Sequence, residues 1–445
     1  MRFLAIAFVL MAFPLFCVWL KQGRRQRLWS YALIGLLPFT ITTLQFDAAL
    51  INWAGWPGHT RGAVITVLDA LALAIIVTHR VPNRTTPLLG WLLLYFFAAV
   101  LSVPFSDLPM ASGFYPFQLA RVIVLAIAVA RIAPDREALR WVAFGLAAGI
   151  TFQAAVTISQ KAEGALQTAG TMGHQNLLGM MTYLVLLPLI ALLLGGEKNK
   201  FILLGVASAL VVIVLGASRG AVGFAGLGLV LLLVLSLARR TSAHKWRILG
   251  LTTVLLALSA PLAYNALQER FVQQGTQSGA GEERRAFERA ANAIWRDHPM
   301  GIGANMYVNV ANMKGYSDRA GVNWSSGRST NVHNAYLLVA AETGWIGLIA
   351  FIALFAAAIA TGLRFAFTDR RDAAGEVVLG YTVALIAVAA HNLFEWILLL
   401  YQAQYMFAIA IGVIAGLVRQ RRMAAGTARK TPKTEFPVLA GETAR

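Results

Sequence analysis

Long apolar segments recur along the whole sequence, and they constrain the fold more than any other feature. Runs of about 17–25 mostly apolar residues follow one another from the N-terminus to Leu417. With 58% hydrophobic and 13% charged residues, the chain has more apolar side chain than a soluble core could bury. Lipid offers no partners to an open backbone, so such runs cross it as helices, whereas barrel strands would alternate. The sequence therefore predicts an all-α polytopic membrane protein.

The candidate spans number 12 or 13, because the first of them is ambiguous. They cover residues 3–20, 28–44, 62–78, 88–103, 117–132, 138–159, 175–194, 200–216, 220–237, 247–264, 334–360, 375–392 and 395–417. The first run could be a signal peptide, but no small-residue cleavage site follows it and its flank, KQGRRQR, is basic. We therefore expect about 12–13 transmembrane helices.

The charges of the loops predict the topology. The formal net charge is +18, but the basic residues lie in short loops between spans, so nucleic-acid binding is not indicated. The basic segments are 21–27, 79–84, 238–247 and 419–433, and the nearly neutral loops are 45–61, 104–116 and 160–174. The positive-inside rule places the basic set in the cytoplasm.

One long connection, 265–333, lies between spans that end on the neutral side. We expect it outside the cytoplasm, which is the periplasm in a Gram-negative cell. Within it, RRAFERAANAIWRD fits an amphipathic helix, and HPMGIG then reverses the chain, since proline and glycine do not continue a helix. The predicted organisation is an N-terminal helix bundle, the periplasmic loop, C-terminal transmembrane helices and a basic disordered cytoplasmic tail. These parts cover 1–264, 265–333, 334–418 and 419–445.

The polar side chains that could do chemistry gather on the outer side. They are Arg121, Lys161, His174, Asn176, Arg219, Arg284, Arg285 and His333. Cations without matching carboxylates favour an anion, and guanidinium groups match phosphate oxygens in pairs. Helix N-termini add partial positive charge. The anion expected at an outer membrane surface is a lipid pyrophosphate.

Several of these residues also have simpler explanations. Arg219 and Arg121 could extend along the helix to the lipid headgroups. The arginines of the loop helix could be solvated surface, and His333 could bond to backbone at a helix start. Glu342, nine residues after His333, could be a helix–helix hydrogen-bond partner or could hold an arginine. The motif HNLFEW at 391–396 is explained equally well by a turn.

Four segments resemble the O-antigen ligase/polymerase superfamily, in matching order. GTMGHQNLLGMMTYLVLLPL is similar to its glycine–asparagine segment, and GASRGAVGF resembles its Ser-Arg-Gly turn. RRAFERAANAIWRDHPMGIGANMY resembles its arginine, aromatic-rich helix, His-Pro and Gly-x-Gly pattern, and HNAYLLVAAETGWIGLIAF resembles its His-Asn helix. The resemblance implies a GT-C-like fold and identifies Arg219, Arg284 and His333 as catalytic. Counting back from the His-Pro pair favours Arg284 over Arg285.

The resemblance also implies the reaction. A glycan is transferred from an undecaprenyl diphosphate carrier, and we expect lipid A–core oligosaccharide as the acceptor, at the periplasmic face of the inner membrane. We assign substrate binding to Arg121, Lys161, His174, Asn176, Arg285, Asn334 and Glu342. The alternative functions are those of an O-antigen polymerase, a protein O-oligosaccharyltransferase or, from another class of protein, a transporter.

We expect the transfer to need no cofactor. The outer face carries no acidic cluster with magnesium-like spacing and the chain has no Walker loop. The single cysteine, Cys17, lies in an apolar run, which excludes a cysteine metal site. Arg219 and Arg284 would stabilise the leaving diphosphate. His333 would take or orient the proton of the acceptor hydroxyl, and direct displacement would invert the anomeric centre.

Overall fold

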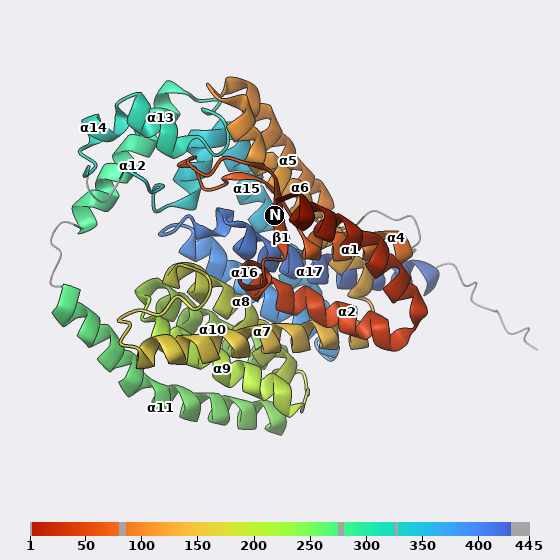
Figure 1. Ribbon diagram of the computed structural model, residues 1–445. Coiled ribbons are helices and arrows are strands. Elements are labelled where there is room, and N and C mark those ends of the chain that lie inside the picture. The colour runs from red at the N-terminus through yellow and green to blue at the C-terminus, as the bar shows by residue number, and fades with distance from the viewer. Residues whose placement is uncertain (1, 80–85, 275–279, 325–327, 429–445) are drawn as a thin grey trace, which may run out of the picture.

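The computed structural model describes residues 2–79, 86–274, 280–324 and 328–428, which form a bundle of helices with one small hairpin (Figure 1). The helices are α1 (Arg2–Gln22), α2 (Arg24–Leu36), α3 (Ile41–Leu44), α4 (Val67–Thr78), α5 (Leu89–Ser102), α6 (Pro109–Ile132), α7 (Arg136–Ala162), α8 (Gln175–Leu194), α9 (Lys200–Gly216), α10 (Arg219–Arg239), α11 (Ala243–Gln274), α12 (Ala280–Asp297), α13 (Tyr307–Met313), α14 (Tyr316–Ala320), α15 (Ala335–Thr368), α16 (Ala373–His391) and α17 (Tyr401–Ala428). Short 3₁₀ helices cover Leu37–Phe39, Val103–Phe105 and Ile397–Leu399.

Eight of the described helices are long and apolar enough to cross a membrane: α1, α6, α7, α8, α10, α15, α16 and α17. Three shorter apolar helices lie at α4, at α5 with its 3₁₀ extension, and at α9. The all-α polytopic membrane fold is thereby confirmed. The predicted span 28–44 is divided among α2, the 3₁₀ helix Leu37–Phe39 and α3, and the span 247–264 falls in α11. None of these is among the eight described helices, so the count of 12–13 stays a prediction.

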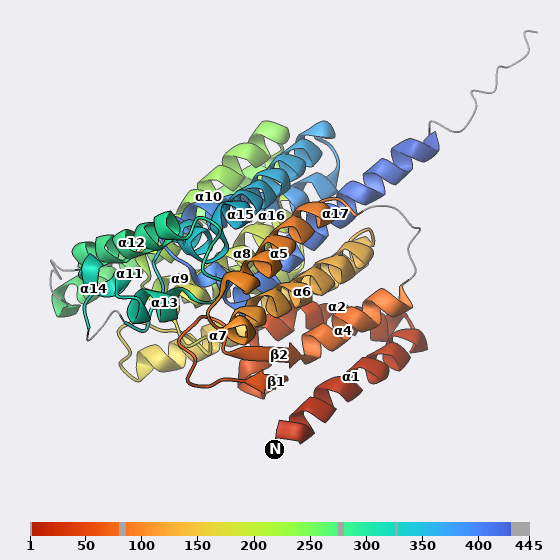
Figure 2. The same cartoon turned by 90° about the horizontal axis from the view of Figure 1, so that it is seen from above.

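The predicted span 62–78 is wrong in its first turn. Its start is strand β2 (Gly62–Thr66), which pairs antiparallel with β1 (Asp47–Asn52) and lies beside α1 (Figure 2). A short apolar run rich in β-branched residues fits a strand as well as a buried helix. Helix α4 begins only at Val67, because Thr66 and Asp69 form a capping box at its N-terminus.

Two further helices differ from their predicted bounds. Helix α6 begins at Pro109, so most of the expected outer loop 104–116 is helical. Helix α17 begins at Tyr401 instead of 395 and continues to Ala428, so the tail expected to be disordered from 419 is helical over its first part. Arg419 fixes this end by donating to the carbonyl of Ala130 at 2.8 Å. Residues 429–445 lie outside the described residues.

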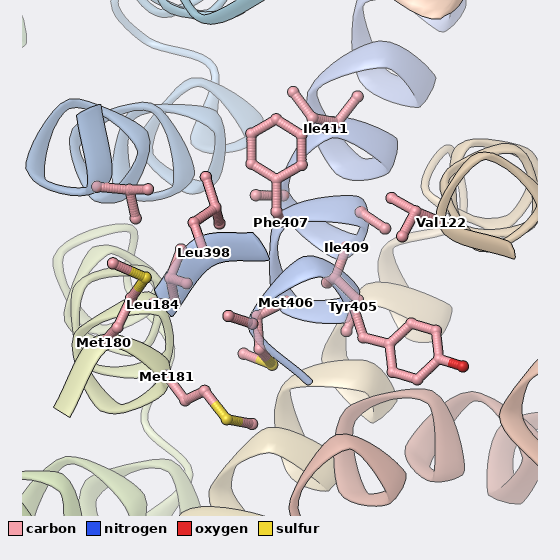
Figure 3. Packing of buried hydrophobic residues seen from close by; sticks show 14 of the residues in the cluster. Val122, Met180, Met181, Leu184, Leu398, Tyr405, Met406, Phe407, Ile409 and Ile411 are labelled. Carbon is pink, nitrogen blue, oxygen red and sulfur yellow. The ribbon is translucent and has the colours of Figure 1, made fainter. Parts of the chain in front are cut away.

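The centre of the bundle is α17, packed between α6 and α8. Figure 3 shows Met406 and Phe407 of α17 among Met180, Met181 and Leu184 of α8 and Val122 of α6. Glycines bring α17 close to α6: a Cβ at Gly416 would lie 2.6 Å from the carbonyl oxygen of Ala130. Small residues of this kind let membrane helices approach each other closely. This dense packing fixes α17 relative to α6 and α8.

Helix α15 is broken near its N-terminal end. Gly344 has φ 66° and ψ −164°, outside the helical range. The segment Pro299–Gly303 docks at this break: Ile302 N–H donates to the carbonyl of Ala341 at 3.1 Å, and Gly303 N–H donates to that of Glu342 at 3.0 Å. HPMGIG was expected to be a chain reversal. It also supplies donors to helix carbonyls that the break leaves without intrahelical partners.

Candidate active site

A buried carboxylate, Glu395, brings together side chains from four separate parts of the chain. His333 Nδ1 lies 3.1 Å from Glu395 Oε2, and Asn176 Nδ2 donates to Oε1 at 2.7 Å. The guanidinium group of Arg284 lies 3.7 Å from Oε1. Glu395 is 4% exposed and lies in the turn between α16 and α17. Three residues predicted from the sequence, Asn176, Arg284 and His333, thus surround Glu395, which was not predicted.

Helix starts position two of these residues. Asn176 is in the first turn of α8, and its Oδ1 accepts a hydrogen bond from Ser218 Oγ at 2.8 Å. Ser218 is the N-cap of α10 and accepts from the amide of Ala221 at 3.3 Å. Arg219, the next residue, is exposed at the N-terminus of α10. The Ser-Arg-Gly turn therefore lies directly against the Asn176–Glu395 pair.

His333 is held at the start of α15. Asn334 caps that helix by accepting from the amides of Tyr336 and Leu337, and the amide of Ala335 donates to the carbonyl of Asn392 at 2.8 Å. An ionised Glu395 can only accept, so the hydrogen bond places a proton on Nδ1 of His333. In the neutral ring, Nε2 then carries a lone pair. With its side chain 28% exposed, His333 can meet a substrate.

The electrostatics favour an ionised Glu395. Burial by itself raises the pKa of this carboxyl. The hydrogen bond from His333, the charge of that ring when it is protonated and the charge of Arg284 outweigh burial and hold the pKa below its ordinary value. Burial lowers the pKa of His174, the N-cap of α8, which favours its neutral form and suits its Nδ1 for accepting from the amide of Asn176 at 3.1 Å. The site thus combines a fixed carboxylate with a half-exposed arginine.

His391 is a buried residue that packs beside this cluster and holds the turn of Glu395 in place. It is 1% exposed, its Nδ1 lies 3.0 Å from the hydroxyl of Tyr183, and its ring stacks on Phe224 at 4.6 Å between centroids. A Cβ at Gly220 would lie 2.8 Å from His391 Nε2, so the Ser-Arg-Gly turn needs glycine here. The carbonyl of His391 accepts from the amide of Glu395 at 3.0 Å, which fixes the turn that carries the carboxylate.

The other expected substrate-binding residues lie in different surroundings. Arg121 is buried in an ion pair with Asp69, 2.7 Å between Nε and Oδ2, and it also contacts Tyr405. Arg285 is exposed and pairs with Glu282. Lys161 lies in the last turn of α7.

Glu342 binds backbone, where an arginine was one expected partner. Its carboxylate accepts from the amides of Asn305 at 2.8 Å and Tyr307 at 3.0 Å, and His59 Nε2 lies 3.3 Å away. Glu342 is 1% exposed. This carboxylate therefore fixes the segment that follows Gly303 and ties it to the loop between β1 and β2.

Sequence reasoning missed Glu395, Ser218 and His391. The signal for two of them was present in HNLFEW, a second His-Asn pair at an outer turn followed by a carboxylate. A turn explains the same letters, and only the fold shows that this turn faces the start of α15. Ser218 lies next to Arg219 in GASRGAVGF, and only Arg219 was predicted there as a functional residue.

One known family matches part of the chain. Residues 203–352 match the family described as O-Antigen ligase, a segment that contains Arg219, Arg284 and His333 but neither Asn176 nor Glu395. The search of curated proteins found no match. The match over residues 203–352 supports the O-antigen ligase superfamily for this chain.

Proposed function

We propose that the chain is an O-antigen ligase, which moves a polysaccharide from undecaprenyl diphosphate to lipid A–core oligosaccharide. Membership of the superfamily supports a glycosyltransferase-like enzyme that acts on lipid-linked glycans. The observation that supports transfer chemistry is the His333–Glu395 pair with the Arg284 guanidinium beside it. A base next to a cation is what transfer from a diphosphate to a hydroxyl requires.

His333 takes the proton in this proposal. The acceptor hydroxyl gives its proton to Nε2, while the hydrogen bond to Glu395 holds the ring and stabilises the imidazolium that forms. The hydroxyl oxygen forms a bond to the anomeric carbon as the bond from that carbon to the phosphate oxygen breaks. Undecaprenyl diphosphate leaves with the electron pair, and direct displacement inverts the anomeric centre.

Arg219 and Arg284 bind the diphosphate. A developing negative charge on the bridging oxygen gains most from cations that are already in place. Arg284 is about half exposed, with its side chain at 48%, so it has N–H groups to offer beyond its contact with Glu395. Arg219 stands at the N-terminus of α10, where the helix dipole also favours an anion.

The site would face the periplasm. Its residues lie at the N-terminal end of α8, while the opposite end of α8 meets the basic connection 238–247, where His244 Nε2 lies 2.8 Å from the carbonyl of Leu193. The positive-inside rule assigns that basic end to the cytoplasm. The inner membrane is the membrane in which such a multi-pass helical protein would lie.

Reconstitution tests the proposal. Purified chain is mixed with undecaprenyl-diphosphate glycan and lipid A–core, without ATP and with EDTA present. Wild type is compared with His333→Ala and Arg219→Ala, and with His244→Ala as a matched histidine control at the opposite end of α8. We expect wild type and His244→Ala to form lipid A–core that carries the polysaccharide. The rate of transfer should fall by at least about 100-fold in His333→Ala and Arg219→Ala.

The products separate the rivals. Longer chains still attached to undecaprenyl diphosphate would identify a polymerase and overturn the ligase assignment. Activity that EDTA abolishes and magnesium restores would overturn the metal-independent step. No transfer by folded wild-type protein to either acceptor would refute transfer chemistry altogether.

A further inference from the structure

A polar cavity lies at the opposite end of the bundle from Glu395. Its volume is about 790 Å³, within the range of ligand-binding pockets. We call it the arginine pocket, after the four arginines that line it: Arg24, Arg136, Arg140 and Arg421. The ends of α7, α8, α16 and α17 form its walls. Nothing in the proposed transfer reaction uses this pocket.

Carboxylates hold the arginines in place without neutralising all of them. Three acids line the pocket, Glu137, Glu197 and Asp372, so the four guanidinium groups leave one positive charge in excess. Arg140 Nε lies 3.1 Å from Glu197. Arg136 lies 4.0 Å from Asp372 and its side chain is 84% exposed. Guanidinium groups anchored on one edge in this manner keep N–H donors available for an anion.

Two helix N-termini add to the positive potential. Arg136 begins α7, and Ala373 and Ala374, which begin α16, line the pocket. The N-terminal end of each helix carries partial positive charge. Aspartate side chains cap both termini, Asp135 at α7 and Asp372 at α16, so the excess arginine charge is the stronger reason to expect an anion with several acceptor oxygens, such as a phosphate group.

The floor of the pocket is apolar. Leu139, Leu192, Val377 and Leu417 line it, and they come from helices whose middle parts are long enough to cross a membrane. Two residues after Leu139, Trp141 packs on Trp29 at 5.0 Å between ring centroids, and Trp29 is 50% exposed. Tryptophan is enriched at the level of the lipid headgroups. The pocket therefore has an anion-binding rim and an apolar base at headgroup depth.

The arginine pocket is separate from the candidate active site. Helix α8 has 20 residues, which is about 30 Å of helix, and carries His174 at one end and the pocket residue Gly195 at the other. Figure 2 shows the C-terminal end of α17 at the opposite end of the bundle from α12–α14. A ligand in the pocket cannot touch Glu395.

We infer that the arginine pocket binds the phosphate headgroup of an anionic phospholipid, with the start of an acyl chain against the apolar floor. The phosphodiester oxygens accept from Arg136 and Arg140, and the lipid lies in the leaflet at the basic end of the bundle. A soluble phosphate ester would use the rim alone and gain nothing from the four aliphatic side chains. Anionic lipids are enriched in the cytoplasmic leaflet, which is the side that loop charge assigns to this end.

Native mass spectrometry of the purified full chain in detergent tests this inference without donor or acceptor glycan. Phosphatidylglycerol, phosphatidylcholine and glycerol 3-phosphate are titrated separately. The test variant is Arg136→Gln/Arg140→Gln. Arg240→Gln/Arg247→Gln removes the same charge from the same end of the bundle, outside the pocket. Arg136→Lys/Arg140→Lys keeps the charge.

We expect wild type to hold phosphatidylglycerol at least tenfold more tightly than phosphatidylcholine. The preference should be lost in the Gln pair and kept in the control and Lys pairs. Equal affinity of wild type for the two lipids, or an unchanged preference in the Gln pair, would overturn the inference. Glycerol 3-phosphate binding as tightly as the lipid would overturn the assignment to a lipid. Thermal melts of all variants show whether each is folded.

Discussion

Replacing Glu395 by glutamine tests whether this carboxylate positions His333 for transfer. Glutamine has nearly the same shape and keeps an oxygen that can accept from Asn176 Nδ2, now 2.7 Å from Oε1. It removes the charge that faces His333 Nδ1 at 3.1 Å and Arg284 at 3.7 Å. The variant therefore changes the electrostatics of the site and leaves its packing in place.

The expected size of the effect follows from the lost charge. A hydrogen bond to a charged group stabilises by about 1.5–3 kcal/mol. If that amount is lost where His333 becomes an imidazolium, the barrier rises equally, and about 1.4 kcal/mol corresponds to a tenfold change in rate. We therefore expect kcat to fall about 10- to 100-fold, with KM for the acceptor nearly unchanged, because Glu395 is too buried to contact it.

The assay is the ATP-free reconstitution, run at several acceptor concentrations so that kcat and KM separate. Glu163→Gln is the control, because Glu163 is an exposed carboxylate that contacts Ser159 near the end of α7. We expect the control to keep the wild-type rate. Glu395→Asp should recover part of the loss, since its carboxylate is intact but set back by one methylene.

A kcat for folded Glu395→Gln within twofold of wild type would refute the positioning role. So would a variant that raises KM tenfold and leaves kcat alone, because that result would make Glu395 a binding residue. Complete loss with a wild-type melting temperature would exceed the estimate and point to direct participation.

Four further outcomes are expected. Arg219→Ala should lower kcat about 10²- to 10³-fold. An equally large rise in KM with kcat unchanged would contradict its role in the transition state. Glu342→Gln should destabilise the fold by about 2 kcal/mol, read as a lower Tm, because the charge bound by two buried amides is lost. Gly344→Ala should lower Tm further or prevent folding, since a Cβ there would lie 2.5 Å from the carbonyl oxygen of Pro299; a wild-type Tm would disprove the strain. The folded pKa of Glu395 is below its ordinary 4.5, so its stabilisation is present above about pH 4.5 and is lost as pH falls through the lowered value. The Tm gap between wild type and Glu395→Gln should close only below pH 4.5, and a gap that closes near neutral pH would show the opposite shift.

Most of the helices could be predicted from the sequence because each depends on local information. The span predicted at 175–194 coincides with α8 and that at 200–216 with α9, where His174 and Asn199 cap the first turns. The amphipathic helix expected in the long loop is α12, whose apolar side chains, including Phe287 and Ile294, are buried. In these segments, apolar length and a capping residue indicate the same start.

The remaining features depend on contacts between distant residues. Asn176 and Glu395 are 219 positions apart, and no local pattern in either segment indicates the other. Arg121 was predicted to bind substrate because its actual partner, Asp69, lies 52 positions away in the sequence. The hairpin was missed for another reason: GAVIT is apolar enough for a membrane helix, and only its pairing with β1 distinguishes the two.

The break at Gly344 has a mechanical consequence for the residue that would receive the proton. The nine residues Ala335–Thr343 are tied through backbone bonds to the Pro299–Gly303 segment, and the longer part of α15 carries the membrane-crossing length. Membrane helices change their tilt when bilayer thickness changes. A change in tilt of the longer part would reach the shorter part, because the amide of Trp345 donates to the carbonyl of Pro299 at 3.1 Å and the same segment therefore holds both sides of the break. The distance between His333 and Glu395 would then depend on the thickness of the lipid around the bundle.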